Sequence, residues 1–256
     1  MIHQTAIVHS GAQIDENVAV GAYSIIGEHV RIGSGTTVGP HAVIDGWTEI
    51  GRENRIFQFA SVGAPPQDLK YNGEKTLLTI GDRNTIREFA TLHRGTADGG
   101  GLTAVGDNNL FMAYSHVAHD CRLGNQVILA NGATLAGHVE IDDFAILGGL
   151  CAVHQFTRVG AHVMISGGSM VAQDVPPFSI AQGDRAKTVG INQVGLKRRG
   201  FSEETIRAIK QAYKLVFRSG LKLEAALEEI AATLGGYPEV IHYADFIRGS
   251  ARGIAR

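Results

Sequence analysis

Residues 105–171 read VGDNNLFMAYSHVAHDCRLGNQVILANGATLAGHVEIDDFAILGGLCAVHQFTRVGAHVMISGGSMV, and every sixth position of this stretch is aliphatic or aromatic. The series is Val105, Phe111, Val117, Leu123, Leu129, Leu135, Ile141, Leu147, Val153, Val159, Ile165 and Val171. A helix repeats its apolar face about every 3.6 residues and a strand every 2, so a period of six fits neither. The pattern is typical of a solenoid.

We interpret each hexad as one short strand followed by one turn, with three hexads closing a triangular coil. Stacked coils would lie ~4.8 Å apart, and their backbone groups would bond to the coils on either side. The repeat therefore predicts a mainly β protein, a parallel β-helix. It resembles the left-handed parallel β-helix of the hexapeptide-repeat transferases, and the left hand comes from that resemblance, because other parallel crossovers are nearly always right-handed.

The same period begins near the N-terminus, in a second series of residues that are six apart. This series is Val8, Ile14, Val20, Ile26, Ile32, Val38, Ile44, Ile50, Ile56 and Val62. Polar, turn-rich segments interrupt it at about 64–77 and 94–103, and they predict two projecting loops. We therefore expect a β-helix over residues 1–189 that carries both loops, where a rigid scaffold tends to place function.

Residues 190–256 change to a helical period and predict a small C-terminal helical domain. Ser202 is a candidate N-cap for a first helix that ends before Gly220. Leu223–Leu234 and Pro238 to about Ser250 predict two more helices. We expect this domain to cover the end of the solenoid, which would otherwise leave an open sheet edge.

The composition narrows the class of protein. The chain has 44% hydrophobic residues, enough for a continuous core, and a formal net charge of -2 that argues against nucleic-acid binding. Cys121 and Cys151 have no metal-ligand spacing, which favours a reducing, cytoplasmic location. We expect neither an export signal nor a membrane span, because there is no leader pattern and no 18-residue apolar run.

Histidines recur on one face of the predicted solenoid. Val117, Leu135 and Val153 are 18 residues apart, which is one full coil, and each is followed within three residues by a histidine: His119, His138 and His154. Three stacked layers of imidazole predict a functional site. Two chemistries stay open at this point, proton transfer near neutral pH and metal binding.

Several segments together resemble the UDP-N-acetylglucosamine acyltransferase family over essentially the whole chain. These segments are Gln67–Tyr71, His93–Thr96, His116–Cys121, Leu135–His138, Val153–Phe156 and Gly195–Phe201. The resemblance implies an acyltransferase of lipid A synthesis, which moves a 3-hydroxyacyl group from acyl carrier protein to the glucosamine 3-hydroxyl of UDP-N-acetylglucosamine.

The resemblance also implies catalytic roles. His119 matches the family's general base, Asp120 its orienting partner, and the backbone N–H of Gly137 its oxyanion donor. Adjacent residues of a strand point to opposite faces, so His119 and Asp120 can pair only at a corner of the coil.

Binding roles are implied in the same way. The matching substrate-binding positions are Gln67, Asp68, Lys70, His116, His138, His154, Gln155, Asn192, Arg198 and Arg199. Gly167 matches the position where a side chain sets the acyl chain length, and glycine there predicts a long chain of roughly twelve to fourteen carbons. Val194 stands where the family has an acidic residue, so the resemblance supplies no carboxylate contact to the nucleotide.

By resemblance we expect a homotrimer with no cofactor and no metal, acting on acyl carrier protein and UDP-N-acetylglucosamine. Three alternatives remain: a zinc enzyme of the carbonic anhydrase type, a non-catalytic scaffold, and the related N-acyltransferase of the same pathway. The zinc enzyme would need three histidines around an open position and leaves the loops and Lys197–Arg199 without a use. The N-acyltransferase has an N-terminal extension for which a chain whose coils start at Val8 leaves no room.

Overall fold

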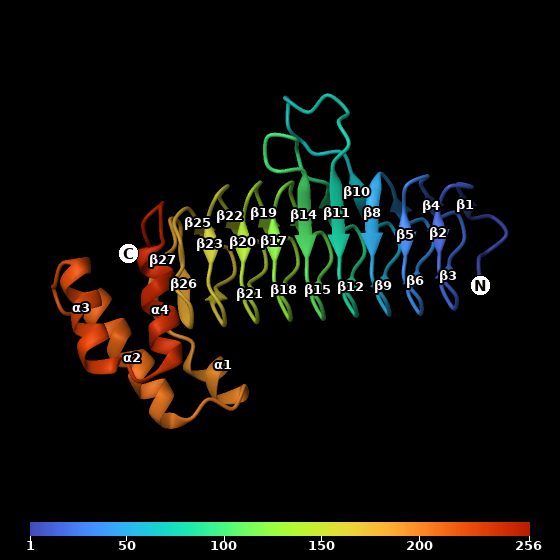
Figure 1. Cartoon of the computed structure of the whole chain (residues 1–256). Helices are drawn as coiled ribbons and strands as arrows, with labels where there is room; N and C mark the ends of the chain where they lie inside the picture. The colour runs from blue at the N-terminus through green and yellow to red at the C-terminus, as the bar shows by residue number, and fades with distance from the viewer.

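Each hexad folds into a short strand and a turn, and strands of successive coils pair in parallel in the computed structural model, which describes residues 1–256 (Figure 1). The register is one full coil: Val117 pairs with Leu135, and Leu135 with Val153. The predicted parallel β-helix is confirmed. Three sheets run along it, and we number them in the order in which the chain visits them.

The first sheet has nine strands: β1 (Ile7–Val8), β4 (Ile25–Ile26), β7 (Val43–Ile44), β10 (Ser61–Ala64), β13 (Thr91–His93), β16 (His116–Val117), β19 (Thr134–Leu135), β22 (Ala152–Val153) and β25 (Met170–Val171). The second has eight: β2 (Gln13–Ile14), β5 (Arg31–Ile32), β8 (Trp47–Ile50), β11 (Leu77–Ile80), β14 (Leu102–Val105), β17 (Arg122–Leu123), β20 (Glu140–Ile141) and β23 (Arg158–Val159). The third has ten: β3 (Ala19–Val20), β6 (Thr37–Val38), β9 (Arg55–Ile56), β12 (Thr85–Ile86), β15 (Leu110–Phe111), β18 (Ile128–Leu129), β21 (Ile146–Leu147), β24 (Met164–Ile165), β26 (Ser179–Gln182) and β27 (Lys187–Ile191).

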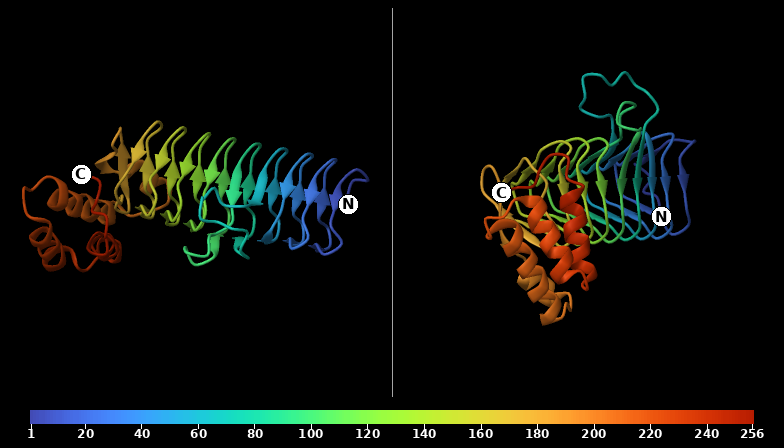
Figure 2. Two further views of the ribbon diagram at one scale, coloured as in Figure 1. Left: turned by 90° about the horizontal axis from the view of Figure 1, so that it is seen from above. Right: turned by 60° about the vertical axis from the view of Figure 1, so that its left-hand side comes forward.

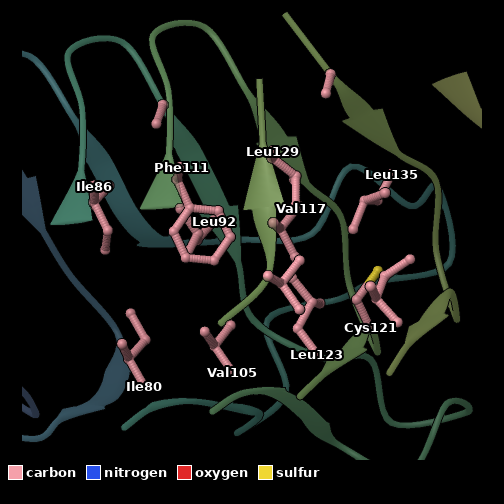
Figure 3. Packing of buried hydrophobic residues seen from close by; sticks show 14 of the residues in the cluster. Ile80, Ile86, Leu92, Val105, Phe111, Val117, Cys121, Leu123, Leu129 and Leu135 are labelled. Atoms are coloured by element: carbon pink, nitrogen blue, oxygen red, sulfur yellow. The ribbon is translucent and has the colours of Figure 1, made fainter. Parts of the chain in front are cut away.

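The hexad positions fill the inside of the prism. Ile86, Phe111 and Leu129 from the third sheet meet Leu92 and Val117 from the first (Figure 3). All five side chains are fully buried. The residue before each hexad position points outward, so alternation within each strand separates the core from the surface.

The turns define three corners of the prism. The first corner joins the first sheet to the second, the second corner joins the second to the third, and the third corner joins the third to the first. One residue of nearly every turn is left-handed, and most of these residues are not glycine: Asp120, His138 and Phe156 at the first corner have φ of 60°, 61° and 62°. Such a backbone is uncommon for residues with a Cβ. Here it recurs because each coil must turn in register with the next.

Two loops leave the solenoid on the same side, at the first corner (Figures 1 and 2). The first loop, residues 65–76, joins β10 to β11, and the second loop, residues 94–101, joins β13 to β14. Both therefore project from coils just before the one that carries His116 and His119.

The chain ends in four helices: α1 (Gln193–Arg198), α2 (Glu203–Phe217), α3 (Leu223–Leu234) and α4 (Pro238–Arg248). The three predicted helices are present, and the Ser202 hydroxyl accepts the Thr205 N–H at 3.0 Å, as expected of an N-cap. The helices have their own apolar core, and the final residues return to the solenoid, where Ile254 bridges Asp174 and Ala255 joins the main core. None of the helices is both long enough and apolar enough to span a membrane.

Candidate active site

His119 and Asp120 lie in the first corner, directly after β16. Asp120 is the left-handed residue of its turn, so its carboxylate swings back toward the side chain of its neighbour. The Nδ1 atom of His119 lies 2.8 Å from Oδ2 of Asp120. Because an ionised carboxylate only accepts, Nδ1 carries the proton and Nε2 is left free to take another.

The second loop holds this carboxylate in place. Asp120 has a side-chain exposure of 2%. Its Oδ1 accepts the backbone N–H of Thr96 at 2.9 Å, and its Oδ2 accepts the Thr96 hydroxyl at 2.7 Å. The backbone N–H of Asp120 donates to Thr103 Oγ1 at 2.7 Å. Sequence reasoning assigned no role to either threonine.

Gly137 lies one coil beyond His119 and faces its ring. A Cβ built on Gly137 would be 2.5 Å from His119 Cε1 and 2.7 Å from Nε2, so only glycine leaves space above the imidazole. The Gly137 carbonyl accepts the Phe156 N–H at 3.2 Å, whereas the Gly137 N–H donates to no group of the chain. A backbone N–H that has no partner within the chain and lies beside an imidazole can serve as an oxyanion donor.

His138 lies beside the His119–Asp120 pair, which we call the dyad. It is at the first corner of the next coil. Its Nε2 lies 3.7 Å from Asp120 Oδ2, and its ring makes an edge contact with His119, with the centroids 5.2 Å apart. Phe156 stacks on its other face at 4.4 Å. Burial lowers the pKa of His138 in spite of the opposing charge of Asp120, so the imidazole is neutral at pH 7 and can accept or donate a hydrogen bond.

His116 is the first residue of β16, three residues before His119, and His93 pairs with it from the previous coil. The two rings make an edge contact at 4.8 Å, and His116 Nδ1 lies 2.6 Å from Thr91 Oγ1. Burial lowers the pKa of His93 to about 4 and also lowers the pKa of His116. Both rings are therefore neutral at pH 7. His93 was not among the predicted site residues.

The first loop brings Lys70 toward the second loop. Lys70 Nζ lies 4.0 Å from Asp98 Oδ2, and both side chains are about four-fifths exposed, at 79% and 80%. Asp68 accepts the backbone N–H of Lys70 at 2.9 Å, and its charge acts on His138, so the loop reaches the first corner. Gln67 lies beside Asp68 in the same loop.

Arg94, which was not predicted as a site residue, hydrogen-bonds to the first loop through Tyr71. Its guanidinium donates to the Tyr71 hydroxyl and to the Gly63 carbonyl, both at 2.9 Å. Arg94 is buried and lies next to the indole of Trp47. Neither the loop contacts nor this buried cation can be read from the repeat.

The other predicted residues are distributed over the prism. His154 and Gln155 lie exposed at the first corner, one coil beyond His138, and His154 approaches Arg252 at 3.4 Å. Gly167 lies at the third corner, between β24 and β25. The single chain does not bring it near His119.

Asn192 and Arg199 lie against the second corner, and Arg198 is exposed at the end of α1. The Arg199 guanidinium stacks on Phe144 at 4.2 Å and donates to Gln126 at 2.9 Å. Asn192 is occupied within the chain, because it donates to the His162 carbonyl and accepts the Gly195 N–H, both at 3.0 Å. It therefore caps α1 and ties that helix to the solenoid.

A metal could be held only near the dyad. His119, Asp120 and His138 offer ligand atoms that lie within 4.8 Å of one another. His154, the third histidine of the zinc hypothesis, is not part of this group.

Comparison with known proteins relates the whole chain to one family. A model described as UDP N-acetylglucosamine O-acyltransferase, domain 2, matches residues 174–255, and the bacterial transferase hexapeptide model matches 11–46 and 103–137. An acyl-[acyl-carrier-protein]--UDP-N-acetylglucosamine O-acyltransferase of Janthinobacterium sp. is 58% identical over 100% of this chain and 99% of its own.

Solved structures agree. LpxA from Acinetobacter baumannii is 46% identical with a TM-score of 0.97, covering 100% of this chain and 99% of that one. The Francisella novicida UDP-N-acetylglucosamine acyltransferase is 44% identical with a TM-score of 0.97, covering 100% and 94%. The predicted fold class is confirmed, and the zinc-enzyme, scaffold and N-acyltransferase alternatives are not favoured. The chain belongs to the UDP-N-acetylglucosamine O-acyltransferase family.

Proposed function

We propose that this chain moves a 3-hydroxyacyl group from acyl carrier protein to the 3-hydroxyl of the glucosamine unit of UDP-N-acetylglucosamine, with His119 as general base. The observation that carries the proposal is that the His119–Asp120 pair faces the unused N–H of Gly137. The chain is also 58% identical over its full length to an acyl-[acyl-carrier-protein]--UDP-N-acetylglucosamine O-acyltransferase.

The chemistry follows from these three groups. Nε2 of His119 takes the proton of the sugar hydroxyl as its oxygen attacks the thioester carbonyl. The carbonyl oxygen becomes an oxyanion that the Gly137 N–H stabilises. The carbon–sulfur bond then breaks, and the departing thiolate receives the proton from the His119 imidazolium. Asp120 keeps Nδ1 protonated throughout and stabilises the transient positive charge.

Neutral histidines suit the sugar around this centre. Because burial lowers the pKa of His116 and His138, each can hydrogen-bond to a hydroxyl without bringing a second positive charge next to the base. Lys70, Gln67 and Asp68 extend the site outward from the first loop, where a cation can meet the diphosphate.

Lys70→Ala is expected to raise the KM for UDP-N-acetylglucosamine by about ten- to hundredfold and to change kcat little. The phosphate contact forms before the transition state and persists in it, so its loss weakens binding of both states equally. Steady-state kinetics measure the split. Lys75→Ala is the matched control, since Lys75 is on the same loop but lies near Trp47. A fall in kcat at unchanged KM would contradict the assignment.

We propose a homotrimer because the outer surfaces of the three sheets differ. Outward positions of the first sheet carry no lysine, arginine or carboxylate and include exposed Ile7, Ile25 and Met170, and those of the third include Leu110 and Ile128. The second sheet presents its charged positions outward: Arg31, Glu49, Arg122, Glu140 and Arg158. The first and third sheets therefore suit contact with other copies, and the second suits solvent.

The third corner, where the first and third sheets meet, carries a ridge of stacked rings. The aromatic ridge comprises Tyr23, His41, Phe59, Phe89 and Tyr114, with centroids 4.9–5.2 Å apart. Its outer edge is open to solvent in one chain. Burial of this ridge along a threefold axis would bring the first sheet of one copy next to the third sheet of its neighbour, a heterologous contact that closes into a ring.

This arrangement also completes the site. The dyad lies at the first corner and Arg199 at the second, so the second sheet separates them within one chain. In a ring, the first corner of one copy faces the second corner of the next. Sedimentation is expected to give three times the mass of one chain. A monomer with full activity would contradict the trimer.

We propose that Gly167, which has no side chain, leaves space for a long acyl chain. It precedes β25, three coils beyond β16, which at ~4.8 Å per coil places it roughly 14 Å along the axis from the level of the dyad. The left-handed residue of its turn is Gly168, with φ of 68°, so Gly167 is not required by the turn. A Cβ on Gly167 would meet only the Gly149 backbone, at 3.2 Å and 3.8 Å.

Gly167→Met is expected to move the preferred acyl chain from roughly twelve to fourteen carbons to a shorter length, by more than tenfold in relative kcat/KM for a two-carbon difference. Competition between acyl carriers of different chain length measures it. Gly236→Met, between α3 and α4 and open to solvent, is the control. An unchanged profile in a folded, active Gly167→Met enzyme would refute this role.

The function itself is tested with the purified chain, UDP-N-acetylglucosamine and a panel of acyl carrier proteins. The expected product is the 3-O-acylated sugar nucleotide together with free carrier thiol. The absence of this ester with every carrier in the panel would contradict the proposal.

A further inference from the structure

The second loop packs against the Asp120 carboxylate and hydrogen-bonds to it. We propose that Thr96 is a positioning residue for the acyl transfer, which fixes the plane of the Asp120 carboxylate and through it the tautomer of His119. This inference rests on the proposed role of His119 as general base.

Thr96 contacts both oxygens of the carboxylate. Its backbone N–H donates to Oδ1 at 2.9 Å, and its hydroxyl donates to Oδ2 at 2.7 Å. Two bonds from one residue to two oxygens determine the rotation of the carboxylate about its Cβ–Cγ bond. Oδ2 then has one remaining position in the carboxylate plane, which His119 Nδ1 takes at 2.8 Å.

The direction of the hydroxyl is also determined. The backbone N–H of Gly99 donates to Thr96 Oγ1 at 3.1 Å, so the oxygen already accepts a proton from the loop. Its own proton points to Asp120, which only accepts when ionised. Thr96 is 5% exposed, so water does not compete readily for this hydroxyl.

Two glycines of the second loop lie directly against the Asp120 carboxylate. A Cβ on Gly99 would lie 2.2 Å from Asp120 Cγ, and a Cβ on Gly95 would lie 2.8 Å from Oδ1. Glycine on both sides of Thr96 therefore allows the threonine to reach both oxygens. A loop whose only task was to join two strands would not need this approach.

Loss of the hydroxyl would leave Oδ1 bonded to the Thr96 N–H and Oδ2 bonded only to His119 Nδ1. The carboxylate and the imidazole could then rotate together, and the imidazole would lose the single orientation in which Nε2 faces the substrate. The sugar contacts lie elsewhere on the first corner and in the first loop, so substrate binding should be preserved. The expected signature is a change in kcat without a change in KM.

The test compares Thr96→Val, which removes the hydroxyl and keeps the shape, with Thr96→Ser, which keeps the hydroxyl. Thr96→Val is expected to lower kcat about ten- to hundredfold at unchanged KM, the effect of losing a hydrogen bond to a charged group. Thr96→Ser is expected to keep kcat close to that of the parent. Thermal unfolding should give a folded protein in both.

A double variant tests whether Thr96 acts through Asp120. Thr96→Val combined with Asp120→Asn is expected to be no slower than Asp120→Asn alone, because the carboxylate is already gone. If His119→Ala is inactive but Thr96→Val matches Thr96→Ser, or if the two losses add fully in the double variant, the positioning role is wrong and the general base stands. If His119→Ala is fully active, the proposed function fails first.

Discussion

His119→Ala is expected to lower kcat by at least roughly 10²- to 10⁴-fold, with the KM for UDP-N-acetylglucosamine little changed. Alanine cannot take the proton of the sugar hydroxyl, and no other imidazole is bonded through Nδ1 to the Asp120 carboxylate as His119 is. His138 is near, but it faces Asp120 from 3.7 Å at its Nε2, so it is not an equivalent base. Single-turnover assays with saturating donor would measure the chemical step directly.

The matched control is His9→Ala. His9 is exposed in the N-terminal coils, and its side chain accepts only the Gly11 N–H at 3.1 Å. Its turnover should equal that of the parent. Equal turnover of both variants would remove His119 from the role of base.

Asp120→Asn is expected to lower kcat by roughly 10²- to 10⁴-fold, by favouring the wrong imidazole tautomer. The carboxylate accepts from three donors: the Thr96 N–H, the Thr96 hydroxyl and His119 Nδ1. An amide has one oxygen and one NH₂ group, and it cannot accept from all three. When the NH₂ group faces Nδ1, that nitrogen must accept, the proton moves to Nε2, and the base is blocked.

Asp107→Asn controls for the same chemical change. Asp107 Oδ1 accepts the Asp82 N–H at 2.7 Å, and Asn125 makes the same bond to Asp107 N–H in the next coil, so this ladder tolerates an amide. Its activity should be unchanged. Full activity of Asp120→Asn would show that proton transfer does not depend on the orientation given by the carboxylate.

The solenoid could be predicted from the sequence because its repeat is written directly in the buried side chains. Between Val105 and Val171 no insertion breaks the period, so 18-residue steps place His138 next to His119. The three long helices were also accessible, because Ser202 is a capping residue and the apolar stripe of α2 has a helical period. The six-residue α1 was missed, since so short a segment has little period.

Glycine played a different part from the one its abundance suggests. Most left-handed turn residues, such as His138 and Phe156, are not glycine, because the stacked coils stabilise that backbone. Glycine is needed instead where a Cβ would strike a neighbouring coil, as at Gly137 against the His119 ring. Composition alone cannot distinguish these two uses.

The contacts that hold the site residues in place could not be predicted, because they come from the two loops that interrupt the repeat. Val62 pairs with Leu92 across 30 residues, and Leu92 with Val117 across 25, so the arithmetic that works elsewhere fails there. The contacts of Thr96 with Asp120 and of Arg94 with Tyr71 depend on loop conformations that no hexad encodes. The placement of Arg199 on Phe144 depends in the same way on how the helices dock.

The coil register makes the solenoid a measuring scale with fixed graduations. The strands that follow Gly167 and precede His119 are joined through β25, β22, β19 and β16 in single-coil steps of ~4.8 Å. Side chains along any line parallel to the axis therefore recur at fixed steps of one coil. Substrate length can be retuned in two ways during evolution: coarsely, by gaining or losing a whole coil, and finely, by replacing one side chain on an existing mark. Under the role proposed for Gly167, neither change would disturb the reacting centre, so the same scaffold could be fitted to acyl chains of different lengths.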